Sequence, residues 1–459
     1  MTPCLNQLLK SFLKNKLMKS IIIFFFLLLL TNCSFDNKTG IWENENNPKN
    51  NQQDLVFKDF KKISSSAEVF DKNIPIDQNF KFKLSKPSQN NVWTDIFYEK
   101  TNNLKNFRYN DNNIVLFKSK RLSKYKINEK ILFDGGKLIL NDTKGNIIIY
   151  SINTKKIIKK FNFYKKKFRG IEKNINLIIE QDVIYISDNI GYIYAYDYNL
   201  DKVLWAKNHK VPFRSNIKLF DKNLVTSNQN NDLLIFDKVT GNIIKLIPSE
   251  ETIINNFFLN NISISNKEIY FLNTYGSLYS VDIDDFKLNW FQNINNNFDT
   301  NLSNLFNGSE IVNYKDKILV SSNESFYVLN SKTGDIINKI NFSPLIKPII
   351  NNQYIFLITK NNLLVSMNSE NGKIIYSYNI EKEVAEFVNS KKKSLEIKNF
   401  MLINNEIFLF LKNSYLIKFS VKGNIKEILK LPSSLNTEPI IINDSLLYLN
   451  KKNKLMVID

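Results

Sequence analysis

Histidine and cysteine are almost missing from this sequence, which limits the chemistry that it can support. Its 459 residues hold two cysteines, Cys4 and Cys33, and one histidine, His209. So few ligands can build neither a disulfide framework nor a Cys/His metal site. His209 lies in a polar stretch, Lys207–Lys210, and is expected to be a solvated turn residue.

Paired acidic residues are missing as well. Asp and Glu are scattered, mainly at expected turns, and no pair has the arrangement that general acid and base catalysis needs. We therefore nominate no catalytic residue, expect no metal and no cofactor, and predict that the protein is not an enzyme.

Positive charge, in contrast, is abundant, and the formal net charge is +19. Such a charge is typical of proteins that bind nucleic acids or membranes. Here it accompanies an excess of Asn, Ile, Phe and Tyr, so we interpret most of it as lysine on solvated faces and expect no nucleic-acid partner. The densest basic run, Lys155–Arg169, predicts a strand with a wet edge, where lysines discourage aggregation. Contact with anionic lipid headgroups is the weaker alternative for this run.

An apolar segment near the N-terminus predicts export. Four lysines between residues 10 and 19 precede an unbroken apolar run, Ile21–Leu30. This run is too short to span a bilayer as a helix, but it suits the apolar part of a signal peptide. The true start is either Met1 or Met18, because the segment from Met18 is a complete short signal by itself.

The four residues Leu30–Cys33 (LTNC) follow at once and resemble the lipobox of bacterial lipoproteins. This resemblance implies that residues 1–32 are removed as a signal peptide and that Cys33 becomes the lipidated first residue. Asn32 departs from the small residue that is usual there, and a buried free cysteine after a short anchor is the alternative. Ser34, where an aspartate would favour the inner membrane, implies the periplasmic face of the outer membrane.

The next segment is polar and only weakly periodic. Residues 33–91, which begin with the lipidated cysteine, are rich in Asn, Lys, Asp, Ser and Gln and predict a flexible, mostly disordered tether. A short helix is expected near Leu55–Ile63. The folded domain is predicted to occupy residues 92–459.

A repeat in residues 92–459 decides the fold class. Each unit has two apolar strands that are separated by a tight turn, and the second strand ends in a short polar residue. The last apolar residues of these second strands, which serve as anchors, are Tyr150, Tyr196, Phe236, Val281, Leu329, Met367, Phe419 and Ile458. The mean period of about 44 residues suits one blade of a propeller. The sequence therefore predicts an all-β, eight-bladed β-propeller of four-stranded antiparallel blades.

Positions at fixed offsets from the anchors support this period. Two residues before each anchor, all eight residues are apolar, as the alternation of a buried strand requires. One residue after each anchor stands Asp, Asn or Ser, which can bind the backbone of a following turn. Five residues before the anchor, six of the eight are Gly or Asn, which tolerate the positive φ of a hairpin.

The eighth repeat is incomplete, because the sequence ends one residue after Ile458. Its outer strand must come from an earlier segment, which would close the ring. Asn113–Ser119 (NIVLFKS) is the first candidate for this strand, and Val92–Tyr98 (VWTDIFY) is the alternative.

Two segments carry a family resemblance. Gly191–Asp197 (GYIYAYD), followed by Trp205, resembles the repeat of quinoprotein-type, or PQQ-like, propellers. With its lipobox the chain is similar to the BamB family, the propeller lipoproteins of the outer-membrane β-barrel assembly machinery. Ser433–Tyr448, with its Glu438-Pro439 step, resembles the last blade of that family, and Asn91–Thr94 resembles its Trp-containing lead-in.

The resemblance implies a non-catalytic periplasmic scaffold that is anchored in the outer membrane. It would bind the central, BamA-like barrel-insertion protein and nascent outer-membrane proteins, as a monomer within a complex. By position, the docking loops are Glu250–Asn261 and Asn296–Gly308, although the Leu/Arg-rich contact motif expected from the family is absent. Their apolar residues are the candidate contacts: Ile253, Ile254, Phe257, Phe258, Leu302, Leu305 and Phe306. Packing between blades is the alternative role of these residues.

Two other functions stay open at this point. One is a cell-envelope binding propeller with an unknown ligand. The other, which is favoured least, is a PQQ-dependent dehydrogenase. Such enzymes carry a vicinal disulfide against the cofactor and a calcium site, whereas residues 92–459 contain no cysteine and no evident carboxylate cluster.

Overall fold

The computed structural model describes residues 33–35, 42–44, 70–251, 258–295 and 305–459. The chain divides into two units, residues 1–66 and 67–459. In the first unit, β1 (Cys33–Phe35) pairs with β2 (Trp42–Asn44) in antiparallel register. The predicted signal peptide and the predicted helix near residues 55–63 lie outside the described residues. No helix within the described ranges is long and apolar enough to cross a membrane.

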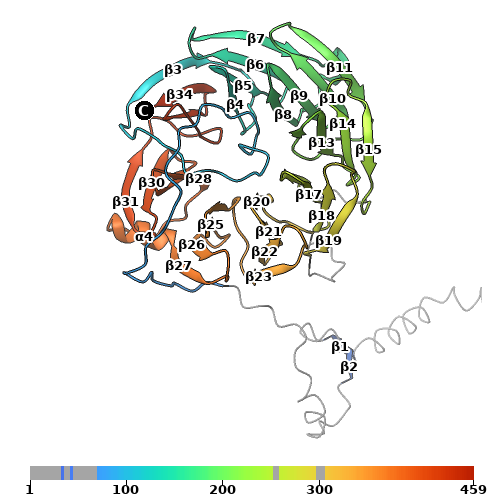
Figure 1. Cartoon of the computed structure of the whole chain (residues 1–459). Helices are drawn as coiled ribbons and strands as arrows, with labels where there is room; N and C mark the ends of the chain where they lie inside the picture. Colours follow the sequence, from blue (N-terminus) through green and yellow to red (C-terminus); the bar gives the residue numbers. More distant parts are fainter. Residues whose placement is uncertain (1–32, 36–41, 45–69, 252–257, 296–304) are drawn as a thin grey trace, which may run out of the picture. The chain divides into compact units, whose positions relative to one another are not determined.

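The second unit is a ring of eight four-stranded antiparallel sheets, which we number as blades 1 to 8 (Figure 1). In blades 1 to 7 the strands follow chain order from the centre of the ring outward. Blades 1 and 2 comprise β4 (Leu132–Asp134), β5 (Lys137–Asn141), β6 (Asn146–Ser151), β7 (Lys156–Asn162), β8 (Ile175–Glu180), β9 (Val183–Asp188), β10 (Tyr192–Asp197) and β11 (Lys202–Asn208). Blades 3 and 4 comprise β12 (Lys218–Phe220), β13 (Asn223–Ser227), β14 (Leu233–Asp237), β15 (Ile243–Ile247), β16 (Asn261–Ile264), β17 (Glu268–Leu272), β18 (Ser277–Asp282) and β19 (Leu288–Asn293).

The other half of the ring repeats this pattern. Blades 5 and 6 comprise β20 (Val312–Tyr314), β21 (Lys317–Ser321), β22 (Phe326–Asn330), β23 (Ile336–Ile340), β24 (Ile349–Asn351), β25 (Tyr354–Ile358), β26 (Leu363–Asn368) and β27 (Ile374–Asn379). Blade 7 and the C-terminal part of blade 8 comprise β28 (Ile397–Ile403), β29 (Glu406–Leu411), β30 (Tyr415–Ser420), β31 (Ile425–Lys430), β32 (Ile440–Ile442), β33 (Ser445–Leu449) and β34 (Lys454–Ile458). In the described part of the chain, two short helices lie between blades: η1 (Lys166–Phe168) and α4 (Ile380–Phe387).

The outer strand of blade 8 comes from the N-terminal side of the chain. β3 (Val115–Arg121) pairs antiparallel with β34, and Val115 lies opposite Ile458. Ile114 and Asp459 extend the ladder by exchanging both of their backbone hydrogen bonds. The predicted ring closure by residues 113–119 is therefore confirmed, and so is the eight-bladed fold.

The anchor residues of the repeat all lie in the third strand of a blade, where they are at most 3 % exposed. In blades 1 to 7 the ladder between the third and fourth strands shifts immediately before the anchor, as between Ala195 and Tyr196. Such a β-bulge increases the local twist of a strand pair. The bulge thus recurs once per repeat, at the position from which the repeat was counted.

The turns predicted from Gly, Asn and Ser also form. Seven of the eight residues that stand five before an anchor have positive φ: Gly145, Gly191, Asn231, Gly276, Asn362, Ser414 and Asn453. The polar residue after the anchor binds the next turn, as where the Asp237 carboxylate accepts the backbone N–H groups of Val239 and Thr240. These local bonds fix where each strand ends.

Aromatic residues of the outer strands join neighbouring blades. The indole N–H of Trp205 in blade 2 donates to the backbone oxygen of Lys238 in blade 3 at 2.9 Å. Trp290 in blade 4 makes the same bond to Ser331 in blade 5, also at 2.9 Å. Each ring packs against a glycine of the same turn, Gly241 or Gly334. The aromatic position of the repeat is therefore a joint between blades.

An irregular segment, residues 88–110, runs inside the ring, and we call it the inner segment (Figure 1). It is hydrogen-bonded at or next to the innermost strand of every blade in turn. Its partners in the order of the inner segment are Asn443 (blade 8), Phe133 (blade 1), Ile179 (blade 2), Lys218 (blade 3), Ile264 (blade 4), Asn313 (blade 5), Ile350 (blade 6) and Leu402 (blade 7). An innermost strand is a sheet edge with unpaired N–H and C=O groups, and the inner segment satisfies part of each edge.

The inner segment changes two predictions. Val92–Tyr98, the alternative closing strand, instead pairs at the innermost strands, where Trp93 bridges Phe133 and Asp95 bridges Ile178. The predicted tether, residues 33–91, is too long, because the propeller unit begins at residue 67. Its end is bound to blade 6, where the Phe82 ring packs at 4.8 Å from that of Tyr354. Polar composition alone did not reveal these contacts.

Candidate binding surfaces

One face of the propeller carries the predicted docking loops. The loops between blades emerge on the same face as the turns between second and third strands, because successive strands reverse direction. We call this the loop face. Residues 250–261 join β15 to β16, and residues 296–308 lie between β19 and β20, so both predicted docking loops belong to it.

The first docking loop is fastened at its base. The Glu250 carboxylate accepts hydrogen bonds from Tyr279 at 2.6 Å, Ser277 at 2.8 Å and Asn273 at 2.6 Å, all in blade 4. Burial opposes the ionisation of Glu250, but these hydrogen bonds outweigh it and lower its pKa. A charged group therefore ties the loop that leaves blade 3 to the next blade.

The described docking residues are divided between core and surface. Phe258 is 7 % exposed and Phe306 is 2 % exposed, and their rings meet edge to face at 4.9 Å. Leu305 is half-buried. Leu259, which was not singled out from the sequence, is 52 % exposed. Ile253, Ile254, Phe257 and Leu302 lie outside the described residues.

His209 differs from its prediction. Its ring is half-buried rather than solvated and packs edge to face against Phe213 at 5.8 Å and Phe236 at 5.3 Å. Burial, together with the charge of Lys207, lowers its pKa. The polar neighbours in the sequence gave no sign of the two aromatic rings that cover it.

A cavity of about 200 Å³ lies at the centre of the ring, between the inner segment and the innermost strands. Three lysine ammonium groups lie over the ring of Phe97: Lys130 at 5.0 Å, Lys347 at 5.2 Å and Lys218 at 5.9 Å. The face of an aromatic ring attracts cations. This central cavity was not predicted, because its residues come from segments that are far apart in the sequence.

The central lysines are held by different partners. Lys218 forms an ion pair with Asp95 at 2.6 Å, and both side chains are almost fully buried. Burial lowers the pKa of Lys218, and the charge of Asp95 partly offsets that effect. Lys130 pairs with Glu438. The Lys347 ammonium donates to the backbone oxygen of Phe97 at 3.2 Å, and burial lowers its pKa to about 7.

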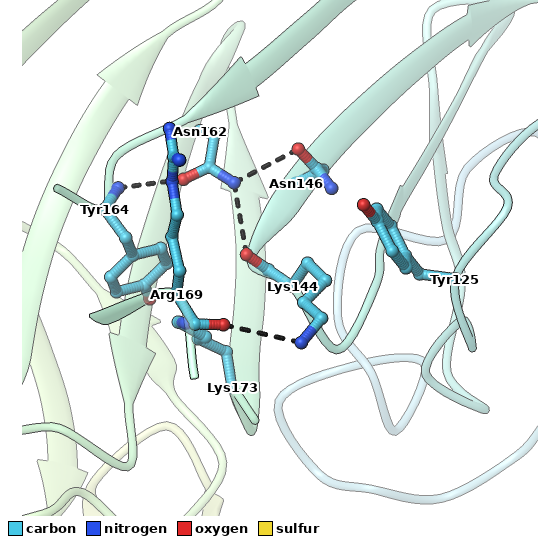
Figure 2. A pocket seen from close by; sticks show the side chains of 7 residues that line it. All are labelled: Tyr125, Lys144, Asn146, Asn162, Tyr164, Arg169 and Lys173. Carbon is cyan, nitrogen blue, oxygen red and sulfur yellow. Dashed lines mark hydrogen bonds between the residues drawn. The ribbon is translucent and has the colours of Figure 1, made fainter. Parts of the chain in front are cut away.

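A second cavity, of about 500 Å³, opens on the loop face between blades 1 and 2 (Figure 2). We call it the basic pocket; its lining residues are Tyr125, Lys144, Asn146, Asn162, Tyr164, Arg169 and Lys173. In Figure 2 the Asn162 amide lies between Tyr164 on one side and Asn146 and Lys144 on the other. The predicted basic strand, residues 155–169, ends at Asn162, and the rest of that run borders this pocket.

The outer edges of the blades form a third kind of surface. Apolar residues are exposed on several outermost strands, among them Ile157 and Ile158 on β7 and Ile243, Ile244 and Leu246 on β15. These strands are last in their sheets. An unpaired edge with apolar side chains can accept another extended chain by β-augmentation.

The ring of eight blades and its repeat define the class of this protein, a propeller of PQQ-like repeats. A family profile described as "Outer membrane protein assembly factor BamB" matches residues 177–378, from blade 2 to blade 6. The resemblance to the BamB family that the sequence indicates is thereby confirmed. No curated protein matches the chain in sequence.

Solved structures share the fold at low sequence identity. BamB from Moraxella catarrhalis is 12 % identical with a TM-score of 0.59, and the match covers 76 % of this chain and 99 % of that one. A computationally designed protein, Ika8, is 9 % identical with a TM-score of 0.57 over 75 % and 99 % of the two chains. A europium-containing methanol dehydrogenase is 12 % identical with a TM-score of 0.56 over 80 % and 89 %. Identities this low establish the fold and leave function open.

The last neighbour raises the question of a metal site. Hard cations are held by several carboxylate or carbonyl oxygens that converge on one point. Within the described ranges, no group of three or more His, Cys, Asp or Glu side chains is close enough together to hold a metal ion.

Proposed function

We propose that this protein is a non-catalytic scaffold of the machinery that assembles β-barrel proteins in the outer membrane. A lipid on Cys33 would anchor it to the periplasmic face of that membrane. The loop face would dock to the central, BamA-like barrel-insertion protein. The observation that carries the proposal is the match of blades 2 to 6 to the BamB family, together with the same eight-bladed architecture.

The first docking loop supports a contact at blades 3 and 4. Its base is held by Glu250 and by the packing of Phe258 against Phe306, so the loop starts and ends at fixed points. The exposed Leu259 lies directly beside buried Phe258. Large apolar side chains on a rigid support are favourable contacts at interfaces. We therefore propose Leu259 as a contact residue, with Phe258 and Phe306 supporting it from beneath.

A matched pair of variants tests the docking face. Leu259→Asp places a charge on the loop face, two residues before blade 4, and Val239→Asp places one on the opposite face, in the turn between β14 and β15 of blade 3, where Val239 is 71 % exposed. We expect Leu259→Asp to reduce co-purification with the barrel-insertion protein about tenfold, the effect of one lost apolar contact, and Val239→Asp to leave it unchanged. Equal co-purification of both variants and the parent would exclude this loop as the dock.

The anchor is tested separately. In the cell, Cys33→Ser should move the protein from the outer-membrane fraction to the soluble periplasmic fraction, because one covalent anchor is lost. The propeller itself should be unaffected, since residues 1–66 form a different unit. If the variant stays in the membrane fraction with its N-terminal segment intact, the alternative of an uncleaved anchor applies. If cross-linking in the envelope captures only unrelated partners, the binding-propeller alternative replaces the assembly role.

Nascent outer-membrane proteins would bind at the blade edges. Such clients are extended, apolar chains before insertion, and β15 offers an outermost strand with Ile243, Ile244 and Leu246 exposed. Backbone hydrogen bonds would supply affinity without regard to the client's sequence. A client peptide that cross-links to blade 1 or 3 at the outer strand, and not to the inner segment, is the expected result.

A further inference from the structure

The basic pocket has an unbalanced positive charge. Three of its seven lining residues, Lys144, Arg169 and Lys173, are cationic, and none is acidic. Across the described ranges, no carboxylate lies within ion-pair distance of any of the three, although many other lysines have such a partner. Like charges that lie close together repel one another, and an anionic ligand would relieve this repulsion.

Lys173 forms the floor of the pocket and is 1 % exposed. Its ammonium donates to the backbone oxygens of Phe168 and Ile171 and lies 5.2 Å from the centre of the Tyr164 ring. Burial, and then the charge of Lys144, lowers its pKa. The acid that partly offsets this, Asp188, already accepts the Tyr164 hydroxyl hydrogen bond at 2.6 Å.

The pocket is built by the fold rather than by chance contacts at the surface. Gly145 has φ +82°, and a Cβ there would lie 2.4 Å from the Tyr164 ring and 3.3 Å from the Lys173 side chain. The Lys144 ammonium donates to the backbone oxygen of Arg169 at 3.4 Å, which brings the tip of the loop over the turn of blade 1. Two elements from different blades thus hold the cations around one opening.

The charged residues and one neutral residue of the lining suit an oxyanion. Tyr125 carries a hydroxyl group, whereas the side-chain amides of Asn146 and Asn162 already donate to Asp142, Lys144 and Asn146 and so fix the shape of the pocket. Phosphate oxygens accept hydrogen bonds from a hydroxyl group and from lysine and arginine, and the guanidinium group can bind two oxygens at once.

The surface beside the pocket extends this match. Lys165, Lys166 and Lys167 are exposed on the same loop, which raises the positive potential around the opening. Ile171, two residues after Arg169, is also exposed. A cationic patch with an apolar residue at its rim is the pattern of surfaces that meet anionic lipid headgroups.

We propose that the basic pocket binds a phosphate-bearing group, with Lys144 and Arg169 as its direct ligands and Lys173 as the buried charge beneath them. The source of the phosphate is either an anionic lipid headgroup or a soluble phosphate compound. This site is independent of the proposed assembly role, because it lies between blades 1 and 2 and shares no residue with the docking loops.

The experiment uses the full chain and two matched double variants. Lys144→Gln/Arg169→Gln removes two charges from the pocket, and Lys332→Gln/Lys373→Gln removes two exposed charges from turns on the opposite face. Binding is measured to inorganic phosphate by calorimetry and to vesicles of phosphatidylcholine with and without phosphatidylglycerol. All variants keep the same N-terminus, so the difference between the two vesicle types isolates the headgroup.

We expect the pocket variant to bind the phosphate probe at least about tenfold more weakly than the parent and the control, because two charge-assisted contacts are lost. Loss of binding to inorganic phosphate identifies a soluble ligand, and loss of the preference for phosphatidylglycerol alone identifies a headgroup. The proposal is overturned if the parent binds neither probe, or if the pocket variant binds as the control does while circular dichroism shows it folded.

Discussion

At the scale of single residues, glycines determine how closely neighbouring blades pack. Gly241 has φ +70°, and a Cβ at this position would lie 2.3 Å from the Trp205 ring of the preceding blade. Gly135 has φ +51°, but nothing lies within 4 Å of its would-be Cβ. The two positions therefore separate the cost of a left-handed backbone from the cost of a collision.

Gly241→Ala should lower the free energy of unfolding by about 2–4 kcal/mol, because the left-handed strain and the overlap with the indole add together. Gly135→Ala should cost only about 1 kcal/mol, the backbone contribution. Denaturant titration of both variants checks the difference. Equal losses of unfolding free energy at the two positions would mean that the Trp205 ring moves away from Gly241 at no energetic cost.

Lys347, which lines the central cavity, makes the stability of the folded protein depend on pH. Burial and the nearby charge of Lys130 lower its pKa from 10.5 to about 7, although Glu310 and Glu438 oppose this shift. Between these two values the folded protein holds fewer protons on this lysine than the unfolded chain does. Its contribution to stability therefore rises with pH through that window.

We predict that Lys347→Met reduces this rise, because methionine cannot be protonated. The quantity to compare is the slope of the unfolding free energy between about pH 7 and pH 9, where one titrating proton contributes at most about 1.4 kcal/mol per pH unit. Lys332→Met at an exposed turn is the control and should keep the parent's slope. A parallel pH dependence of all three proteins would contradict the lowered pKa.

At the scale of elements, the repeat made the blades predictable. Apolar residues in alternation, a short polar residue after each anchor and Gly or Asn in the hairpin are all local signals. They gave the eight sheets and, because the last repeat lacks a strand, also the closing strand β3. The bulges before the anchors could not be predicted from the sequence, because a bulge changes the pairing of two strands without changing their residue composition.

The inner segment was not predictable in the same way. It has no regular strand or helix, and its bonds to the eight blades come from both its backbone and its side chains. Several of the side-chain bonds come from amides: Asn102 donates to the backbone oxygens of Ile262 and Ile311, which bridges blades 4 and 5. In an Asn-rich sequence such a residue looks the same as one in a polar tether.

Removal of the inner segment tests its contribution. A chain that begins at residue 67 should unfold at the same temperature as the full chain, because it contains the whole propeller unit. Relative to a chain that begins at residue 88, which keeps the inner segment, a chain that begins at residue 111 keeps β3 but loses the bonds to the innermost strands, each worth about 0.5–1.5 kcal/mol. We expect its Tm to fall by about 10 °C or more. An unchanged Tm would show that the inner segment covers the sheet edges without stabilising them.

The docking residues illustrate why a candidate site is harder to predict than a fold. Phe258 and Leu259 are adjacent apolar residues in one predicted loop, yet the first is buried against Phe306 and the second is exposed. Only the position of the next blade decides between these roles. The basic pocket and the central cavity likewise depend on loops from separate blades, so neither has a motif in the sequence.

At the scale of the whole molecule, the net charge disfavours self-association, whereas the exposed blade edges favour it. Eight blades present eight outer edges, and some carry exposed apolar residues. The formal charge of +19 keeps copies of the chain apart. Lysines on an outermost strand also hinder its pairing with another chain. β7 carries three lysines within its seven residues, whereas β15 carries only Lys245 among apolar neighbours.

Salt should therefore cause self-association, and the β15 edge should pair more readily than the lysine-rich β7 edge. Raising the ionic strength from about 0.1 M to about 1 M shortens the Debye length from about 10 Å to about 3 Å, which removes most repulsion between the lysine-rich surfaces. Ile244→Lys adds a second lysine to β15 and should reduce the association, because an inserted lysine blocks strand pairing at that edge. Ile157→Lys on the lysine-rich β7 edge is the matched control and should associate as the parent does, as measured by sedimentation velocity. If both variants behave alike, pairing at β15 is excluded, and with it the reason to prefer this edge over β7 as a place where an extended client chain would bind.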